Sequence, residues 1–215
     1  MKKLLQILIL VLISINVNAQ ANNDVRIHFS ENISWFNFKT SDGTLDRTLD
    51  SKVNFGFGMN YDISINKKFY IRPELALQNL GAIAQNNGQI LEWELNYVHG
   101  GVGFGYCYEK YRLQPFAGVS VYGGYLLNGY QTIGYTYLNI KENKSIKSMD
   151  FGATANYGFN FQFSEQVGTF VEFRNLFGLN QLESNLDGQT TQELYNRNFS
   201  VHFGLKLSLG TFGRI

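Results

Sequence analysis

An apolar side chain at every second position is the feature of this sequence that most restricts its fold. From Val53 to Ser64, the residues VNFGFGMNYDIS carry apolar side chains at odd positions and Gly, Asn, Asp or Ser at even positions. Because successive side chains of a β-strand point to opposite faces, this segment is predicted to be a strand with one bulky apolar face and one small polar face. The apolar face contacts either the core of a soluble β-sandwich or lipid.

The same period of two recurs along the chain and predicts eight strands, whereas no ten-residue window favours an amphipathic helix. The outward apolar series of these strands begin at Val25, Val53, Phe69, Leu91, Leu113, Phe151, Val167 and Phe199. In the fourth series, Leu91, Trp93, Leu95 and Tyr97 alternate with Glu92, Glu94 and Asn96. The parity then changes at His99-Gly100-Gly101, which predicts a β-bulge there. Glu31 falls on the apolar side of the first strand and suggests a local bulge.

Short and long connections alternate between the predicted strands. The short ones are Ile65 to Lys68, Glu109 to Arg112 and Ser164 to Gln166. The long polar ones are Lys39 to Lys52, Asn79 to Gln89, Asn128 to Ser148 and Asn180 to Arg197. This alternation is typical of outer-membrane barrels, whose periplasmic turns are short and whose extracellular loops are long. We expect Tyr130, Tyr135 and Tyr137 to prolong the strands beyond the membrane, to offer contacts to a partner, or to pack together at the mouth.

Strand length and face composition favour lipid over the core of a sandwich. Several patterns hold for 11 to 13 residues, whereas a globular strand has about 5–6 and a tilted membrane strand needs roughly 9–11. The apolar face is aromatic, and the other face carries Gly, Asn, Ser and charges. In lipid every backbone polar group needs a partner, so the last strand must pair with the first. The predicted fold is all-β, an eight-stranded antiparallel up-and-down transmembrane β-barrel with short periplasmic turns and long extracellular loops.

The first residues have the layout of a cleaved secretory signal peptide. Lys2 and Lys3 precede an apolar run from Leu4 to Ile15, and small residues lead to Ala19. The run is shorter than the roughly 20 apolar residues of a membrane-spanning helix. We therefore expect a signal peptide at 1–19, one barrel domain at 20–215, and location in the outer membrane.

Composition excludes two further classes of protein. The single cysteine, Cys107, rules out an internal disulfide. The formal net charge of +1, with acids and bases interspersed, gives no case for nucleic acid as a partner. No metal-ligand cluster or phosphate-binding glycine loop stands out, so no cofactor, metal site or catalytic residue is predicted.

The polar face of the strands carries the candidate functional residues, which we expect to form a structural network in the lumen. Its members are Arg26, Asp62, Arg72, Glu74, Glu92, Glu94, Asp150, Glu172, Arg174, His202 and Lys206. An isolated buried charge costs several kcal/mol, so these groups must pair. Eight strands leave an interior just wide enough for side chains, which disfavours a general diffusion porin. The alternative interpretation of the network is a proton or ion path.

Some small outer-membrane barrels are enzymes, and that alternative requires a His–acid or Ser–His–acid arrangement near the outer rim. The chain has three histidines, His28, His99 and His202. None of them belongs to a recognisable motif, although Ser200 lies two residues from His202. If the protein is a lipid-modifying enzyme, His99 or His202 with Glu92 or Glu94 is the first combination to test.

Three segments resemble the PorT-like outer-membrane β-barrel family. They are FYIRPELAL at 69–77, YRLQPFAGVSVYGGYLL at 111–127 and VEFRNLFGLNQL at 171–182. They are similar to the family's R-P-E strand, L-x-P-[YF] strand entry and E-x-R-[YF]-x-x-G-L strand exit. Asn175 departs from the family's usual Tyr, and residues 210–215 follow a last strand that usually ends near the terminus. The resemblance implies a membrane barrel, and one branch of the family serves a secretion system and gliding.

The leading functional hypothesis is a non-enzymatic outer-membrane barrel that binds, displays or assembles something through its extracellular loops. The alternatives are an envelope-lipid-modifying enzyme on the same barrel and a narrow channel or secretion-system accessory. The expected partners are outer-membrane lipid and an envelope or secretion-system protein, and the barrel itself is expected to be a monomer.

Overall fold

The computed structural model describes residues 23–39, 45–46, 49–86, 88–109, 111–183 and 193–209. The predicted signal peptide at 1–19 and the terminal residues 210–215 lie outside the described residues. Within the described ranges, no helix has the length and apolar character to cross a membrane.

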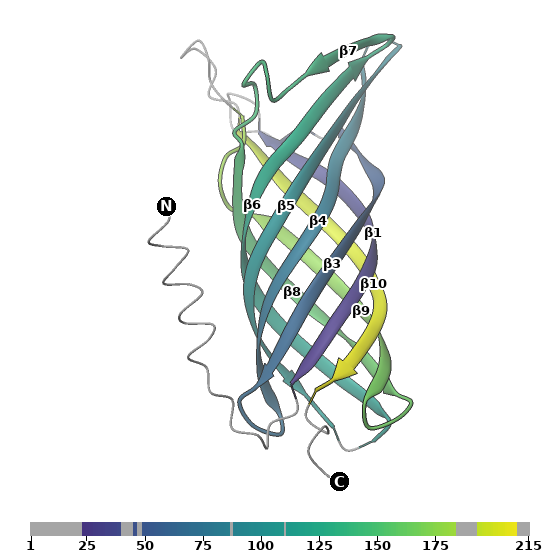
Figure 1. The fold of residues 1–215 in the computed structure, drawn as a ribbon. Coiled ribbons are helices and arrows are strands. Elements are labelled where there is room, and N and C mark those ends of the chain that lie inside the picture. The colour runs from purple at the N-terminus through teal and green to yellow at the C-terminus, as the bar shows by residue number, and fades with distance from the viewer. Residues whose placement is uncertain are drawn as a thin grey trace.

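Eight long antiparallel strands in the described part of the chain form a closed, tilted ring (Figure 1). They are β1 (Asp24–Lys39), β3 (Leu49–Ser64), β4 (Phe69–Asn86), β5 (Gln89–Cys107), β6 (Leu113–Ile133), β8 (Met149–Gln162), β9 (Val167–Gly178) and β10 (Glu193–Ser208). The short strands β2 (Leu45–Asp46) and β7 (Thr136–Asn139) pair with β1 and β6. Pairing of β1 with β10, from Asp24↔Ser208 to Lys39↔Glu193, closes the ring. The predicted eight-stranded up-and-down barrel is confirmed.

The two ends of the barrel differ as the connection lengths predict. Turns near 65–68, 108–112 and 163–166 gather at one end, which we call the turn end, and the remaining connections lie at the opposite loop end (Figure 1). The prediction of a long loop from Asn79 to Gln89 is wrong, because β4 and β5 remain paired up to Asn86↔Gln89. Tyr130 of β6 pairs with Asn139 of β7. The hairpin formed by β6 and β7 therefore also extends the barrel wall.

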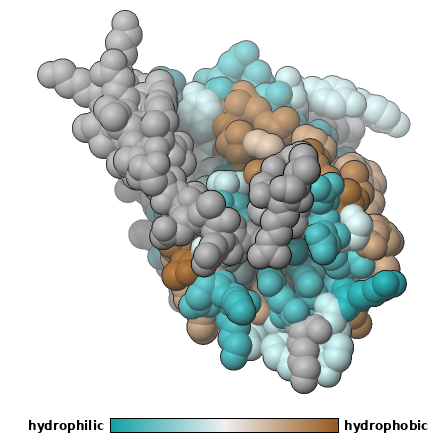
Figure 2. All heavy atoms as spheres, turned by 60° about the horizontal axis from the view of Figure 1, so that its bottom comes forward, coloured by the Kyte–Doolittle hydropathy of each residue, from teal (hydrophilic) through white to brown (hydrophobic). Residues whose placement is uncertain are grey.

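A band of exposed apolar side chains surrounds the half of the barrel nearer the turn end. Phe57 of β3 is 56% exposed, and Phe159 of β8 and Val121 of β6 are also exposed. Hydrophilic residues gather at the turn end, with apolar residues on the flank behind it (Figure 2). A soluble protein rarely exposes an apolar patch of this extent, so the band identifies the surface that contacts lipid. The phenylalanines of β8 point outward, which excludes the sandwich alternative.

The two β-bulges predicted from the sequence, at Glu31 and at His99, are absent from the structure. β1 pairs without interruption through Glu31, which lies opposite Val201 and Phe55 and projects onto the apolar outer face. β4 and β5 keep one register past His99, so no bulge occurs there. The register shifts lie elsewhere, between Ser51 and Gly56 of β3 and between Asn96 and Tyr97 of β5.

The unbroken register of β5 with β4 reverses the expected orientation of the first half of β5. Leu95 and Tyr97 share the parity of the inward residue Cys107, and both are buried inside the barrel. Glu92 and Glu94 therefore point outward, contrary to the prediction that they line the lumen. Each of their carboxylates forms a salt bridge with Lys52, at 2.8 Å for Glu92 and 3.4 Å for Glu94.

The polarity of the wall thus inverts along the barrel axis. Near the turn end the outer face is apolar and the inner face is charged. Near the loop end the outer face carries Lys52, Glu92 and Glu94, and the inner face carries leucines and aromatic residues. The loop end is organised like a water-soluble barrel, since its apolar side chains cluster inside and its charges face outward.

We predict that Phe57→Arg destabilises the folded barrel by about 2–4 kcal/mol, because it places a charge on the lipid face near the middle of the apolar band. The measurement is the midpoint of urea unfolding in lipid vesicles. Asp50→Arg on the same strand, exposed near the loop end, is the matched control and should change the midpoint little. Equal effects of the two substitutions would contradict the position of the band.

Candidate functional site

The lumen holds a cluster of charged side chains centred on Glu172 of β9. Its Oε2 accepts a hydrogen bond from Nη1 of Arg72 at 2.8 Å, and its Oε1 accepts one from Nη2 of Arg174 at 2.7 Å. Asp62 of β3 accepts from Nη2 of Arg72 at 2.8 Å. Nη1 of Arg26 lies 3.4 Å from the Asp62 carboxylate. Four strands, β1, β3, β4 and β9, thus contribute one ion-pair network.

Glu74 completes this ion cluster and balances its charge. Its Oε2 lies 3.0 Å from Nη1 of Arg174, so three guanidinium groups face three carboxylates. Each of these side chains is less than 10% exposed. Aromatic rings cover the guanidinium group of Arg26, at 3.8 Å from the Phe170 ring and 4.5 Å from the Phe116 ring. Balanced charges and several hydrogen bonds offset the cost of burying Arg72, Arg174 and Glu172. Nε and Nη2 of Arg26, by contrast, have no hydrogen-bond partner among the described residues.

Two further predicted lumen residues lie outside the ion cluster. Lys206 is near the turn end, where its Nζ lies 3.0 Å from Oδ2 of Asp24. Asp150 is nearer the loop end and accepts hydrogen bonds from the hydroxyl of Tyr122 at 3.2 Å and the amide of Asn196 at 2.8 Å. The lumen is therefore polar over most of its height, and its charges are concentrated in the ion cluster.

His202 lies beside His28 in the buried lumen, with their ring centroids 4.7 Å apart. Nε2 of His202 and Oγ of Ser200 are 2.8 Å apart. Gly58 makes room for this layer, because a Cβ there would lie 2.6 Å from Nε2 of His28. The layer is packed and closed, with Ser200 and His202 fully buried.

The predicted combinations of His99 or His202 with Glu92 or Glu94 are not assembled. His99 and His202 point into the lumen, whereas Glu92 and Glu94 lie on the opposite face of the wall. Among the described residues, Nδ1 of His202 has no hydrogen-bond partner, so Ser200 and His202 lack the third member of a triad. Nor do the described residues contain a cluster of His, Cys, Asp and Glu that could hold a metal ion.

Above the polar lumen lies an apolar cluster that sequence analysis missed, which we call the mouth core. Its buried members are Phe36, Leu80, Ala82, Leu95, Tyr97, Leu126, Ile140, Ile146, Leu182 and Leu194. Loop segments close it: the amide of Lys147 donates to the carbonyl of Leu182, and the amide of Leu182 donates to the carbonyl of Leu194. Leu80, Leu95 and Leu126 are fully buried, so the mouth core is a packed apolar layer inside the loop end of the barrel.

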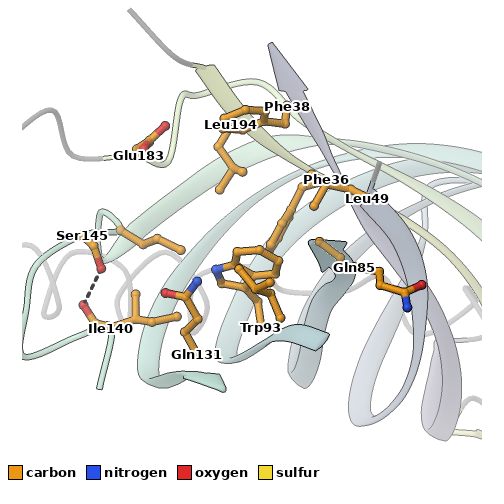
Figure 3. A pocket seen from close by; sticks show the side chains of 13 residues that line it. Phe36, Phe38, Leu49, Gln85, Trp93, Gln131, Ile140, Ser145, Glu183 and Leu194 are labelled. Carbon is orange, nitrogen blue, oxygen red and sulfur yellow. Dashed lines mark hydrogen bonds between the residues drawn. The ribbon is translucent and has the colours of Figure 1, made fainter. Parts of the chain in front are cut away.

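A pocket of about 520 Å³ lies at the loop end of the mouth core (Figure 3). We call it the mouth pocket, and it is lined by Phe36, Phe38, Leu49, Ala84, Gln85, Leu91, Trp93, Gln131, Ile140, Ser145, Ile146, Glu183 and Leu194. Most of these side chains are apolar and come from the strands. Ser145 and Glu183 belong to the loop segments that border the pocket. Its volume is that of a small-molecule site.

The salt bridges outside the mouth core pass over β4 at Gly81. Gly81 of β4 pairs with Glu94, and a Cβ on Gly81 would lie 3.4 Å from Cδ of Lys52. Lys52 on β3 therefore passes over β4 to reach Glu94 and Glu92 on β5. Asn79 adds a hydrogen bond from its amide to Glu94 at 2.9 Å.

The fold is shared with solved structures of small outer-membrane barrels. OprG from Pseudomonas aeruginosa superposes with a TM-score of 0.56 at 12% identity, covering 88% of this chain and 96% of that one. Neisserial surface protein A superposes with a TM-score of 0.52 at 10% identity, covering 87% and 97%. No family model and no curated protein matches the sequence. The likeness establishes the fold as that of eight-stranded outer-membrane barrels.

We predict that Glu172→Gln lowers the free energy of unfolding by about 3–5 kcal/mol, because it leaves buried guanidinium groups without their central carboxylate. The measurement is equilibrium urea unfolding in detergent. Glu193→Gln removes a pair with Lys39 whose side chains are over 40% exposed, and should cost about 0–1 kcal/mol. A loss for Glu172→Gln no larger than for Glu193→Gln would contradict the structural role of the ion cluster.

Proposed function

We propose that the chain is an integral outer-membrane protein, with its turn end in the periplasm and its loop end outside the cell. The exposed apolar band and the fold shared with small outer-membrane barrels support this placement. Polar side chains at the loop end would then stand in water above the lipid.

Membership of the PorT-like family is part of this proposal. The R-P-E motif contributes Arg72 and Glu74 to the ion cluster, and the E-x-R motif contributes Glu172 and Arg174. A shared structural task for motifs on two separate strands supports the resemblance. A secretion-system accessory role stays an alternative, and the monomeric state stays a prediction.

We further propose that the protein binds at the cell surface and does not conduct. The inversion of polarity along the barrel carries this proposal. The ion cluster fills the lumen at membrane depth, and the fully buried Leu80, Leu95 and Leu126 close it again at the mouth. A solute entering from the loop end would meet two closed layers in succession. What remains accessible there is the mouth pocket and the surrounding loops.

Orientation can be tested by labelling single cysteines in a Cys107→Ser background. Tyr135→Cys, at an exposed position of the loop end, should react with a membrane-impermeant maleimide on intact cells. Lys67→Cys, in the exposed 65–68 turn, should react only after the outer membrane is permeabilised. The reverse pattern, or equal labelling on intact cells, would contradict the proposed orientation.

The closed lumen predicts no stable ion-conducting steps when the purified barrel is inserted into a planar bilayer. A general diffusion porin in the same bilayer serves as the positive control, and a heat-dependent gel shift shows that the sample is folded. Steady conductance from the folded wild-type protein would support the narrow-channel alternative and contradict the plug.

A further inference from the structure

We propose that the mouth pocket binds one largely apolar small molecule that carries a neutral or cationic hydrogen-bonding group, such as a long-chain alcohol or amine. The inference rests on the proposed function, because it requires the loop end to be reached from outside the membrane. It adds the chemical class of the ligand and excludes fatty acids and other anions as preferred occupants.

The size and walls of the mouth pocket fit an apolar ligand. Its volume of about 520 Å³ lies within the range of roughly 300–1,000 Å³ of small-molecule sites. Phe36 and Trp93 form an edge-to-face pair with centroids 6.1 Å apart, and Leu49 and Leu91 also line the pocket. Rigid aromatic and branched walls facing an open space lose dispersion contacts that a hydrocarbon would restore.

The polar groups of the mouth pocket select the charge of the ligand. They are Gln85, Gln131, Ser145 and Glu183 (Figure 3), and none of the described lining residues is Lys or Arg. Oε2 of Glu183 is buried and has no hydrogen-bond partner among the described residues. This oxygen would accept a hydrogen bond from a hydroxyl or ammonium group, whereas a ligand carboxylate would be repelled.

The floor of the mouth pocket makes it a terminal site. Phe36, Ile140, Ile146 and Leu194 belong both to the pocket lining and to the mouth core. The fully buried Leu95 belongs to the same core. A ligand therefore enters from the loop end and stays at the mouth.

The two tryptophans of the chain, Trp35 and Trp93, provide a matched pair of reporters. Trp93 lines the mouth pocket, and Trp35 has the outward parity of β1. Trp35→Phe keeps only the pocket reporter, and Trp93→Phe keeps only the outer one. An ω-bromoalkanol quenches indole on contact, so each variant in detergent is titrated with ω-bromoundecanol. We expect saturable quenching of Trp93 at one probe per protein, and weak, non-saturating quenching of Trp35.

Substitutions on the two faces of β4 distinguish binding of the probe in the mouth pocket from general partitioning of the probe into detergent. Ala84→Phe fills the pocket and should weaken binding of ω-bromoundecanol at least about tenfold, or about 1.4 kcal/mol. Ile83→Phe, the neighbouring position on the outer face, should leave binding unchanged. The corresponding bromocarboxylate should bind at least about tenfold more weakly than the alcohol. In the Glu183→Gln variant, the ratio of the two affinities should be smaller.

Two results would overturn the inference. Quenching of Trp93 that never saturates, or that Ala84→Phe leaves unchanged, would show that the pocket binds no such molecule. Equal or tighter binding of the carboxylate would overturn the charge selection. Failure of the proposed function can be distinguished from failure of this inference. It would appear as loss of the heat-dependent gel shift or as labelling of Lys67→Cys on intact cells, whatever the titration shows.

Discussion

Each strand of this barrel passes from one solvent into another while its side chains keep alternating between the two faces. A wall in lipid cannot leave a free edge, so the sheet closes through β1 and β10. Closure fixes an inside and an outside for every residue. Where lipid surrounds the wall, apolar residues face out and charges fill the lumen. Where water surrounds it, the arrangement reverses, and Lys52 pairs with Glu94 outside while Leu95 packs inside. The mouth core and its pocket follow from that reversal.

Within the part of the barrel that lipid surrounds, the charges that fill the lumen form the ion cluster. A lumen of eight strands is filled by side chains, and long charged ones can fill it only in balanced sets. Glu172 contacts Arg72 and Arg174, and Glu74 and Asp62 supply the remaining negative charge. Aromatic rings against Arg26 complete the packing. Such a cluster ties together strands that lie far apart in the sequence.

Sequence parity predicted the barrel, its strand number, the outward Phe159 and the inward Arg72 and Glu172, because alternation reports directly on the two faces of a strand. Sequence parity placed Glu92 and Glu94 on the wrong face, because an apolar side chain was taken to face lipid along the whole of β5. The correct assignment required an unbroken register through His99, which depends on pairing with β4 and is not visible in one strand. The mouth core was missed for the same reason, and its closure by loop segments is non-local. Glu31 obeys parity but places a carboxylate on the apolar outer face, and nothing in the structure explains it.

Quenching by lipids brominated on their acyl chains tests the inversion of polarity most directly. Phe57→Trp in a chain lacking both native tryptophans reports on the outer face within the apolar band, and Trp93 in the Trp35→Phe variant reports on the interior of the loop end. Reconstituted into brominated vesicles, the tryptophan at position 57 should be strongly quenched and Trp93 should keep its fluorescence. Strong quenching of Trp93 together with a bright tryptophan at position 57 would contradict the account.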